Sequence, residues 1–400
     1  MEDESLLMVN MFGPDRPGIL AAFAEVLQHR NIEIVDIQQA SLQETIGLHL
    51  LLKFGAASQS KDSAIKDLLF ESHRLNLTPN FQLRTPDKIQ GIDDRKRLVL
   101  IFFGDTRAVA ELSKVLAEED AKIEMIFSQM HHGARSFEMI LNIAGVNRVD
   151  RLKNCVMAKS RELNVDLAVQ NIVAHRKNKR MICFDMDSTL VDMEGIDEMA
   201  RKAGVHREVA RITDKAMRGD FDFEESLRQR VAMLRGLKLD DVMGIRNQMV
   251  LSEGTDELLT TLKWLGFKLG IVSGGFDIFT DYLKDKFSLD FAYANRLEIK
   301  NGALTGKVSG DIVDAAQKAR LIDQVACDTG IPLDQVVAIG DGANDSLMLT
   351  QAGLGIAYNA KKGLDRVANA ALSKARFNHV FHLLGITEED IREAMTCQTV

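Results

Sequence analysis

The sequence has few of the residues that mark secreted, membrane-embedded or disordered chains. It has four cysteines in 400 residues, without CxxC spacing, which suggests neither a disulfide framework nor a zinc site. Only five prolines and no low-complexity tract are typical of an ordered globular protein. No apolar run approaches the roughly 18 residues of a membrane helix. The start, MEDESLLMVN, is acidic where a signal peptide is basic, so we expect a cytoplasmic protein.

An excess of positive charge is also lacking. Lys and Arg number 50 against 58 Asp and Glu, which gives a formal net charge of −8. Such a chain has no electrostatic footprint for nucleic acid or an anionic membrane, so a small-molecule partner is expected. With 400 residues, of which 46% are hydrophobic, the chain exceeds one ordinary core and predicts two or three domains.

The first part of the sequence contains a duplicated pattern. Apolar periodicity predicts strands at 6–12, 32–37, 48–54 and 80–84 and helices at 19–29 and 60–76, which is the βαββαβ order of a ferredoxin-like module. The segment IEIVDIQ at Ile32 is matched by IEMIFSQ at Ile123, 91 positions later. We therefore predict one module at 1–86 and a second at 96–176, joined by a polar linker at 85–97.

The first module resembles the ACT domain, which commonly binds free amino acids. The resemblance rests on GPDRPG at 13–18, where glycines permit a tight turn and a helix begins. It implies an effector site at Asp15 and Gly18, with L-serine or another amino acid as the ligand; ordinary turn chemistry is the alternative. The second module lacks the Pro-Gly element and is expected to be structural. Edge-to-edge pairing of such sheets suggests a homodimer.

The remainder, 180–400, is organised around Met181–Asp192, MICFDMDSTLVD. Its apolar start predicts a strand of a parallel sheet buried on both faces, and Asp185 and Asp187 follow the strand's carboxyl end, where ligands of α/β sheets bind. Neighbouring carboxylates repel, so a cation is expected, and oxygen ligands favour Mg²⁺. Alternatively, the two aspartates merely cap the following turn.

An α/β pattern surrounds that strand. Residues at about 193–252 are helical and charged, which predicts an inserted cap. Further strands are predicted at 268–273, 291–294, 336–339 and 354–357, with a hairpin at 297–308 that turns at Asn301-Gly302 and a helix at 314–329. We expect a doubly wound, mostly parallel Rossmann-like sheet with a helical cap, preceded by the two ferredoxin-like modules.

The ordered motifs DMDST, Ser273 at a strand end, Lys318 and GDGAND resemble the haloacid dehalogenase superfamily of phosphohydrolases over about residues 180–360. By chemistry and by this resemblance, Asp185 is the nucleophile on phosphorus, and Asp187 is the general acid and base. Ser273, the Gly274 N–H group and Lys318 would bind phosphoryl oxygens. Taken alone, Lys318 would be read as a solvated helix lysine.

The same resemblance assigns the metal site. Mg²⁺ would be held by Asp185, the backbone carbonyl of Asp187 and Asp341. Asn344 would help to bind the substrate, and Asp345 would support the metal site. A sensor protein with an inactive hydrolase domain is a rival interpretation, although no expected catalytic position has been lost.

The cap region suggests the substrate. VDMEGIDE around Glu194 and FEESLRQRVAMLRGL around Arg230 resemble segments of the phosphoserine phosphatases. The resemblance implies that Glu194 and Arg230 hold the ammonium and carboxylate groups of O-phospho-L-serine, while Met217 and Phe223 close over it. Without the resemblance, both charges would be read as solvated helix residues. Transfer of the phosphoryl group to another alcohol, such as homoserine, uses the same core residues and remains an alternative.

Overall fold

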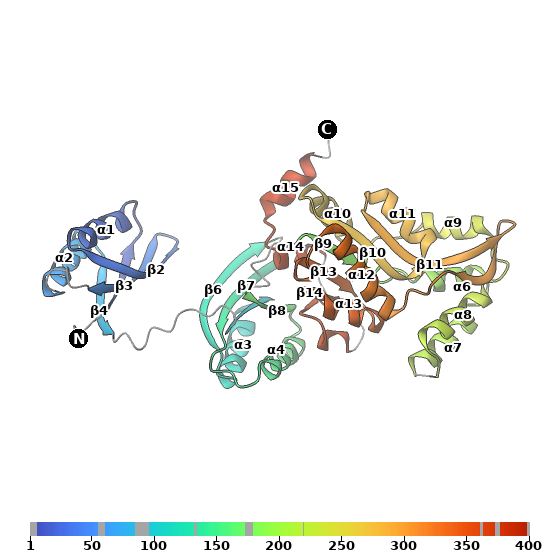
Figure 1. The fold of residues 1–400 in the computed structure, drawn as a ribbon, viewed down its shortest axis with the longest axis horizontal. Helices are drawn as coiled ribbons and strands as arrows, with labels where there is room; N and C mark the ends of the chain where they lie inside the picture. The colour runs from blue at the N-terminus through green and yellow to red at the C-terminus, as the bar shows by residue number, and fades with distance from the viewer. Residues whose placement is uncertain are drawn as a thin grey trace. The chain divides into compact units, whose positions relative to one another are not determined.

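The computed structural model describes residues 6–54, 61–84, 96–131, 134–172, 179–218, 220–360, 363–372 and 377–397. The chain forms two compact units, Met1–Ile92 and Asp93–Val400, and each is described by itself (Figure 1). Most of the predicted linker at 85–97, and of the joint before Met181, lies outside the described residues. In the described part of the chain, no helix combines the length and apolar character needed to cross a lipid bilayer.

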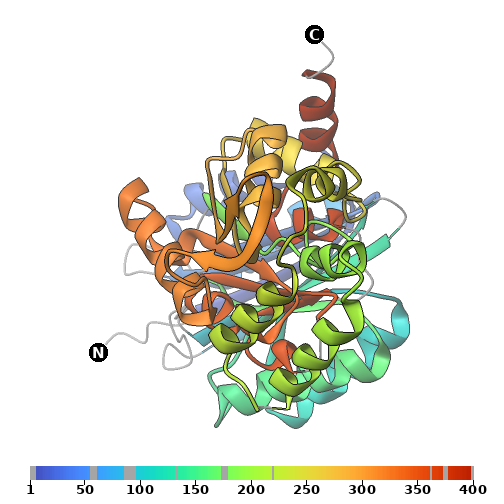
Figure 2. The same ribbon diagram turned by 90° about the vertical axis from the view of Figure 1, so that its right-hand side faces the viewer.

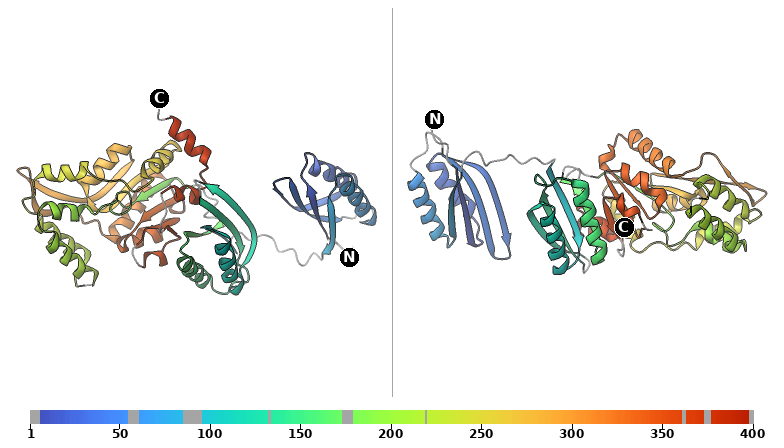
Figure 3. Two further views of the ribbon diagram at one scale, coloured as in Figure 1. Left: turned by 180° about the vertical axis from the view of Figure 1, so that it is seen from behind. Right: turned by 90° about the horizontal axis from the view of Figure 1, so that it is seen from below.

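The first unit is a four-stranded antiparallel sheet with two helices on one face (Figure 3, right). Its elements are β1 (Leu6–Pro14), α1 (Ile19–His29), β2 (Ile32–Leu42), β3 (Thr45–Phe54), α2 (Lys61–Arg74) and β4 (Thr78–Arg84). Alternate residues of β3 are buried against α1 and α2, as the period of a half-buried strand requires. The strand order β2-β3-β1-β4 confirms the predicted ferredoxin-like fold.

The second unit begins with the same arrangement. Its elements are β5 (Arg97–Phe103), α3 (Thr106–Glu118), β6 (Lys122–His131), β7 (Ala134–Asn142), α4 (Val149–Leu163) and β8 (Leu167–Asn171). The strands lie in the order β8-β5-β7-β6, equivalent to that of the first unit. The duplication seen in the sequence is therefore a duplication of topology.

An α/β fold follows. Its central strands run parallel to one another and are β9 (Met181–Phe184), β10 (Lys268–Phe276), β11 (Phe291–Lys300), β13 (Val336–Gly340) and β14 (Leu354–Tyr358). Side chains of β9 alternate between two cores. Ile182 and Phe184 share a core with helices α10 (Thr255–Trp264) and α11 (Asp277–Phe287). Met181 and Cys183 face α12 (Ala315–Thr329) and α13 (Ser346–Gln351). The predicted doubly wound sheet is confirmed.

The structure describes four helices between β9 and β10, where an inserted cap was expected: α6 (Gly195–Lys202), α7 (His206–Met217), α8 (Phe223–Met233) and α9 (Leu239–Asn247). They lie in front of the sheet in Figure 2, coloured green to yellow. Apolar residues of all four, including Met199 and Val231, join the core that contains Phe184. The helices are thus packed onto the sheet beside the end of β9.

Two features of the sheet differ from the sequence interpretation. The predicted strand at 291–294 and the first arm of the hairpin form one strand, β11, which pairs with β10 and then with β12 (Ala303–Ser309). The short strand β15 (Ala370–Leu372) was not predicted. It pairs with β14 on one side and β8 on the other, so the second module and the α/β fold share one 11-stranded sheet. Their division near residue 180 remains a prediction.

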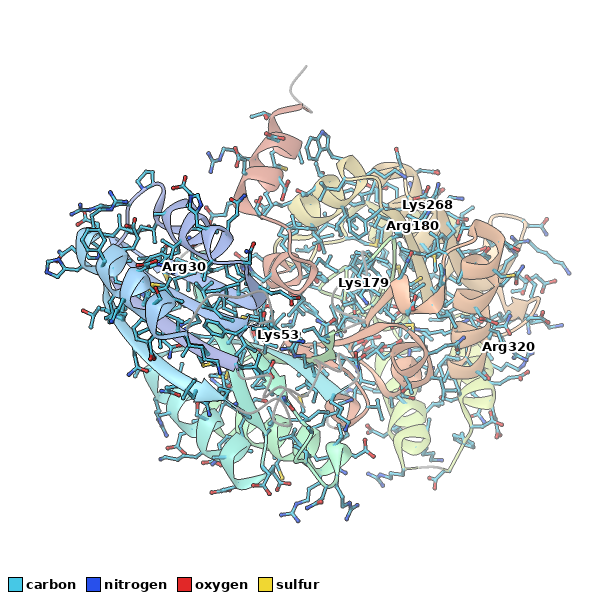
Figure 4. The ribbon with its side chains drawn as sticks, turned by 60° about the vertical axis from the view of Figure 1, so that its left-hand side comes forward. Arg30, Lys53, Lys179, Arg180, Lys268 and Arg320 are labelled. Carbon is cyan, nitrogen blue, oxygen red and sulfur yellow. The ribbon has the colours of Figure 1, made fainter. Side chains whose placement is uncertain are left out.

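The amino ends of the central strands carry basic residues. Figure 4 shows Arg180 and Lys268 beside one another, where β9 and β10 begin. Asp290, just before β11, accepts hydrogen bonds of 3.0 Å each from Lys263 and Lys268 and one of 2.9 Å from the Leu269 N–H group. These ion pairs fix the amino end of the sheet, whereas Asp185 follows the opposite, carboxyl end of β9.

Candidate active site

Three neighbouring strands end at one edge of the sheet and bring the predicted catalytic residues together. In the parallel register, Phe184 at the end of β9 pairs with Ile271 of β10 and Ile339 of β13. The next residue, Asp185, donates its N–H group to the Ile339 carbonyl over 2.8 Å and is 3% exposed. Since carboxyl ends of parallel strands meet at one edge, the residues after all three strands share a single site.

Lys318 of α12 lies between two of the aspartates. Its Nζ atom is 2.9 Å from Oδ2 of Asp185 and 2.7 Å from Oδ1 of Asp345, and its side chain is fully buried. Burial alone would lower the pKa of Lys318, but the two carboxylates raise it above its ordinary value. The lysine is therefore a fixed cation in the site, and the solvated alternative is wrong.

Three buried carboxylates gather here. One oxygen each of Asp185, Asp341 and Asp345 lies within 4.8 Å of the others. A side chain at Gly340 would collide with Asp345, so the glycine lets the strand end approach the cluster. Both oxygens of Asp345 already accept hydrogen bonds, from Lys318 and from the Gly342 N–H group at 3.0 Å. Burial, with the neighbouring Asp185 carboxylate, raises the pKa of Asp345 to about 7.

This all-oxygen set fits a hard divalent cation. A cluster of three buried carboxylates with one lysine has an excess of negative charge, and such oxygen ligands favour Mg²⁺. Asp185 and Asp341, two of the predicted metal ligands, belong to the set, and their binding of a metal stays a prediction. Asp345, predicted as a supporting residue, is oriented by Lys318 and the Gly342 N–H group.

Asp187 lies at the cap side of the site. Its Oδ1 atom accepts a hydrogen bond of 2.9 Å from the Gly195 N–H group at the start of α6. A Cβ atom at Gly275 would lie 2.5 Å from Oδ2 of Asp187, so this glycine gives the carboxyl group its space. Burial and the nearby carboxylate of Glu194 hold the pKa of Asp187 well above its ordinary value.

Ser273 and Gly274 lie in a bulge of β10. The parallel pairing with β11 stops at Val272 and resumes at Phe276, with a shift in register. Ser273 is buried, and its Oγ atom accepts a hydrogen bond of 3.0 Å from the Gly275 N–H group. The bulge turns these residues away from the regular ladder and toward the edge that carries the aspartates.

The cap places charged residues around the same site. Glu194 accepts a hydrogen bond of 3.0 Å from the Ser188 hydroxyl. Arg230 is half-buried, and its Nε atom donates to the Ser226 carbonyl over 3.3 Å. Burial lowers the pKa of Arg230, while Asp197 and Glu194 oppose that shift. The charge of Glu194 thus acts on Arg230, and their facing one substrate pocket stays a prediction.

Of the other predicted substrate residues, the structure describes the side chains of Phe223 and Asn344. The ring of Phe223, at the start of α8, lies 3.1 Å from the position of a Cβ atom at Gly274, so it covers the bulge. Asn344 is half-buried and adjoins Gly342 after β13. Met217 ends α7, and its side chain lies outside the described part of the chain.

Three residues of the site were not foreseen. The charge of Asp197 opposes the lowering of the Arg230 pKa, Gly275 makes room for Asp187, and Asn295 hydrogen-bonds to the bulge. Asp197 lies within the quoted VDMEGIDE segment, three residues after Glu194, which is one helical turn and was an available signal. The other two depend on contacts between segments distant in sequence.

The predicted effector residues line a cavity in the first unit. A volume of about 790 Å³ is bordered by the turn at 14–20, including Asp15 and Gly18, and by residues of β2 and the β2–β3 turn. Gly18 is the N-cap of α1 with φ 90°, and no side chain caps the helix. In the second module, Asp105 caps α3 by accepting hydrogen bonds from the Arg107 and Ala108 N–H groups. The two helix starts therefore differ.

Comparison with known proteins agrees with this geometry. A model of haloacid dehalogenase-like hydrolases matches residues 182–350, and an ACT domain model matches residues 5–82. The phosphoserine phosphatase of Streptomyces coelicolor is 38% identical over 402 aligned residues, covering 98% of this chain and 95% of that protein. The phosphoserine phosphatase SerB2 of Mycobacterium tuberculosis is 34% identical over 391, covering 97% and 95%.

A solved structure has the same fold. The crystal structure of a probable phosphoserine phosphatase from Vibrio cholerae matches with a TM-score of 0.58 and 31% identity, covering 78% of this chain and 93% of that one. Fold and site together define a haloacid dehalogenase-like hydrolase with an amino-terminal ACT domain. Given relatives that align over nearly the full length, the chain belongs to the phosphoserine phosphatase family.

Proposed function

We propose that the protein hydrolyses O-phospho-L-serine to L-serine and phosphate through a phosphorylated aspartate. The observation that carries the proposal is the buried group in which Asp185 contacts Lys318 beside Asp341 and Asp345. A carboxylate oxygen of Asp185 attacks phosphorus, the ester P–O bond breaks, and Asp187 gives its proton to the serine oxygen. Water, deprotonated by Asp187, then attacks phosphorus, releases phosphate and restores Asp185.

The remaining core residues bind the transferring phosphoryl group. Lys318 is fixed beside Asp185 and supplies a positive charge, and the bulge at Ser273 and Gly274 supplies small polar donors. Donors of this kind, already oriented in a buried site, stabilise charge that develops in the transition state. Asn344, which follows β13 and adjoins Gly342, is also proposed to contact the substrate.

Magnesium is the proposed metal. Asp185, Asp341 and the backbone carbonyl of Asp187 would hold it, and Asp345 would orient the site. When bound, the ion neutralises phosphoryl oxygens and lowers the repulsion between the phosphate group and the attacking carboxylate. This agrees with the buried, all-oxygen donor set.

The cap is proposed to select the amino acid end of the substrate. Glu194 would pair with the ammonium group and Arg230 with the carboxylate group, while the ring of Phe223 would exclude water. The interaction between Arg230 and the carboxylates of Asp197 and Glu194 supports this division. An aryl phosphate, which has neither group, would use the core residues alone.

We expect the replacement of Arg230 by methionine to raise the KM for phosphoserine at least about tenfold, because a charge-assisted contact to the substrate is lost. The kcat/KM for an aryl phosphate should change by less than about threefold. Phosphate release would be measured after removal of divalent ions with a chelator and addition of Mg²⁺, with and without homoserine as an acceptor. Arg228 is the matched control, since it lies on the same helix and pairs with Glu224 at the surface.

Equal kcat/KM of the unaltered protein on phosphoserine, phosphothreonine and an aryl phosphate would refute the assigned role of the cap. A homoserine phosphate product would favour phosphoryl transfer over hydrolysis.

The first module is proposed to bind L-serine or another free amino acid. Its helix α1 begins without a side-chain cap beside a cavity of about 790 Å³, whereas Asp105 occupies the equivalent position at α3. The N–H groups at the start of α1 can therefore donate hydrogen bonds to the carboxylate of a ligand, whereas those at α3 already donate to the Asp105 carboxylate.

Titration calorimetry with L-serine on the full chain that carries Arg230→Met, in which product binding at the cap is weakened, should find one site in the first module. Gly18→Asn should abolish it, because asparagine tolerates a positive φ and its amide would cover the helix start. Asp105→Asn, in the second module, should leave the heat unchanged. No heat with serine or any other amino acid in the unaltered chain would end this part of the proposal.

We also propose a homodimer that acts in the cytoplasm. Strand β6 lies at an edge of the sheet and exposes Ile126, Phe127 and Met130, and such apolar edge strands favour pairing with another chain. The free thiols of Cys155, Cys183 and Cys327 are typical of a reducing compartment. Light scattering should give twice the mass of the chain.

A further inference from the structure

The bulge that carries Ser273 leaves backbone groups that the sheet cannot pair. Three residues of β10, 273–275, lie between the pairs Val272–Tyr293 and Phe276–Asn295, where β11 has one. Regular ladder hydrogen bonds are therefore interrupted at the bulge, and buried backbone groups need other partners.

Asn295 supplies that partner. It is fully buried, and its Nδ2 atom donates a hydrogen bond of 2.9 Å to the Gly274 carbonyl. The N–H group of the same peptide, that of Gly275, donates to the Ser273 Oγ atom over 3.0 Å. The peptide between the two glycines is thus held at both ends, and the orientation of Ser273 depends on that peptide.

The other end of the Asn295 amide contacts the segment that leads into the helix that carries Lys318. Its Oδ1 atom accepts a hydrogen bond of 2.9 Å from the Val313 N–H group. The next residue, Asp314, is the N-cap of α12. Its backbone carbonyl accepts a hydrogen bond of 2.8 Å from the Lys318 N–H group. One side chain therefore connects the bulge with the start of α12.

We propose that Asn295 is a positioning residue that sets Ser273 and Gly274 relative to Lys318, so that all three meet the same phosphoryl group. The inference rests on the proposed function of these three residues. Asparagine suits the position because one short side chain must offer a donor and an acceptor at once. Aspartate has the same shape but no donor, and it would place a carboxylate oxygen against the Gly274 carbonyl.

The test compares Asn295→Asp and Asn295→Leu with the unaltered enzyme, with rates normalised to the folded fraction. We expect kcat on phosphoserine to fall about 10- to 100-fold, since small displacements of oriented groups have effects of this size. KM should stay within about threefold, because the cap holds the other end of the substrate. The inhibition constant of orthovanadate, which mimics five-coordinate phosphorus, should rise by a factor similar to the loss in kcat.

Asn369 provides a matched control, because its Oδ1 atom also accepts a backbone hydrogen bond, 2.8 Å from the Gly355 N–H group at the start of β14. Asn369→Ala should lower stability without changing kcat. The same loss in the Asn295 variants is expected with an aryl phosphate, so a wrong assignment of the substrate would leave this test intact. Unchanged kcat in both Asn295 variants, or an equal loss in Asn369→Ala, would overturn the proposal.

Discussion

Asp185→Asn is expected to lower phosphate release from phosphoserine by about 10⁴-fold or more, because an amide cannot form the bond to phosphorus. Labelled phosphoserine, quenched in acid, should leave hydroxylamine-labile phosphate on the unaltered protein and none on the variant. The neighbouring variant, Asp187→Asn, should still become phosphorylated, unlike Asp185→Asn. It slows both proton transfers, so the phosphorylated protein should form slowly and then persist.

The control for this pair is Asp192→Asn. Asp192 is exposed and lies seven residues from Asp185, outside the proposed machinery, so the rate should stay within about twofold. Acid-stable phosphate on the Asp185→Asn protein would show that another residue is the nucleophile and would contradict the mechanism.

Lys318→Met should abolish activity and also destabilise the fold. The methionine keeps most of the volume but leaves the carboxylates of Asp185 and Asp345 buried without the cation that now lies 2.9 and 2.7 Å from them. Breaking a buried pair in this way costs about 3–5 kcal/mol. Urea unfolding in the presence of a chelator would measure the loss, since a divalent ion would neutralise the same carboxylates.

A second change separates the two effects. Adding Asp345→Asn to Lys318→Met removes one of the unpaired charges, so at least half of the lost stability should return while activity stays absent. Lys263→Met is the control at a partly exposed pair with Asp290 and should cost about 1 kcal/mol or less. A Lys318→Met protein as stable as the unaltered chain would show that the burial of this charge does not support the fold.

The elements that position the core residues could be predicted because their signals are local. Met181–Phe184 and Val336–Ile339 are apolar runs followed at once by acidic or glycine-rich segments, and both are buried strands. The helix that carries Lys318 was also predictable from its apolar period and its aspartate cap. In each case the local sequence indicates both the type of element and the residue at which it begins or ends.

The contacts that orient the site could not be predicted in this way. Asn295 acts through a shift in register between β10 and β11, and nothing within either segment reveals that shift. The need for glycine at 275 comes from a carboxyl group 88 positions earlier. Strand β15 has only three residues, too few for a period, and owes its place to β14 and β8.

The continuous sheet has a consequence for how this protein can be divided. Val99, Ile101 and Ala168 of the second module pack in the same core as Ile182 and Phe184, the residues that lead to Asp185. A shortened chain starting near residue 93 would keep that core whole. One starting at 180 would lack β8, so β15 would lose one of its two pairing strands and apolar side chains of the core would be exposed to solvent. The second module thus supports the strand that leads to Asp185, while the first module forms a compact unit of its own, which can bind a ligand without being part of the catalytic core.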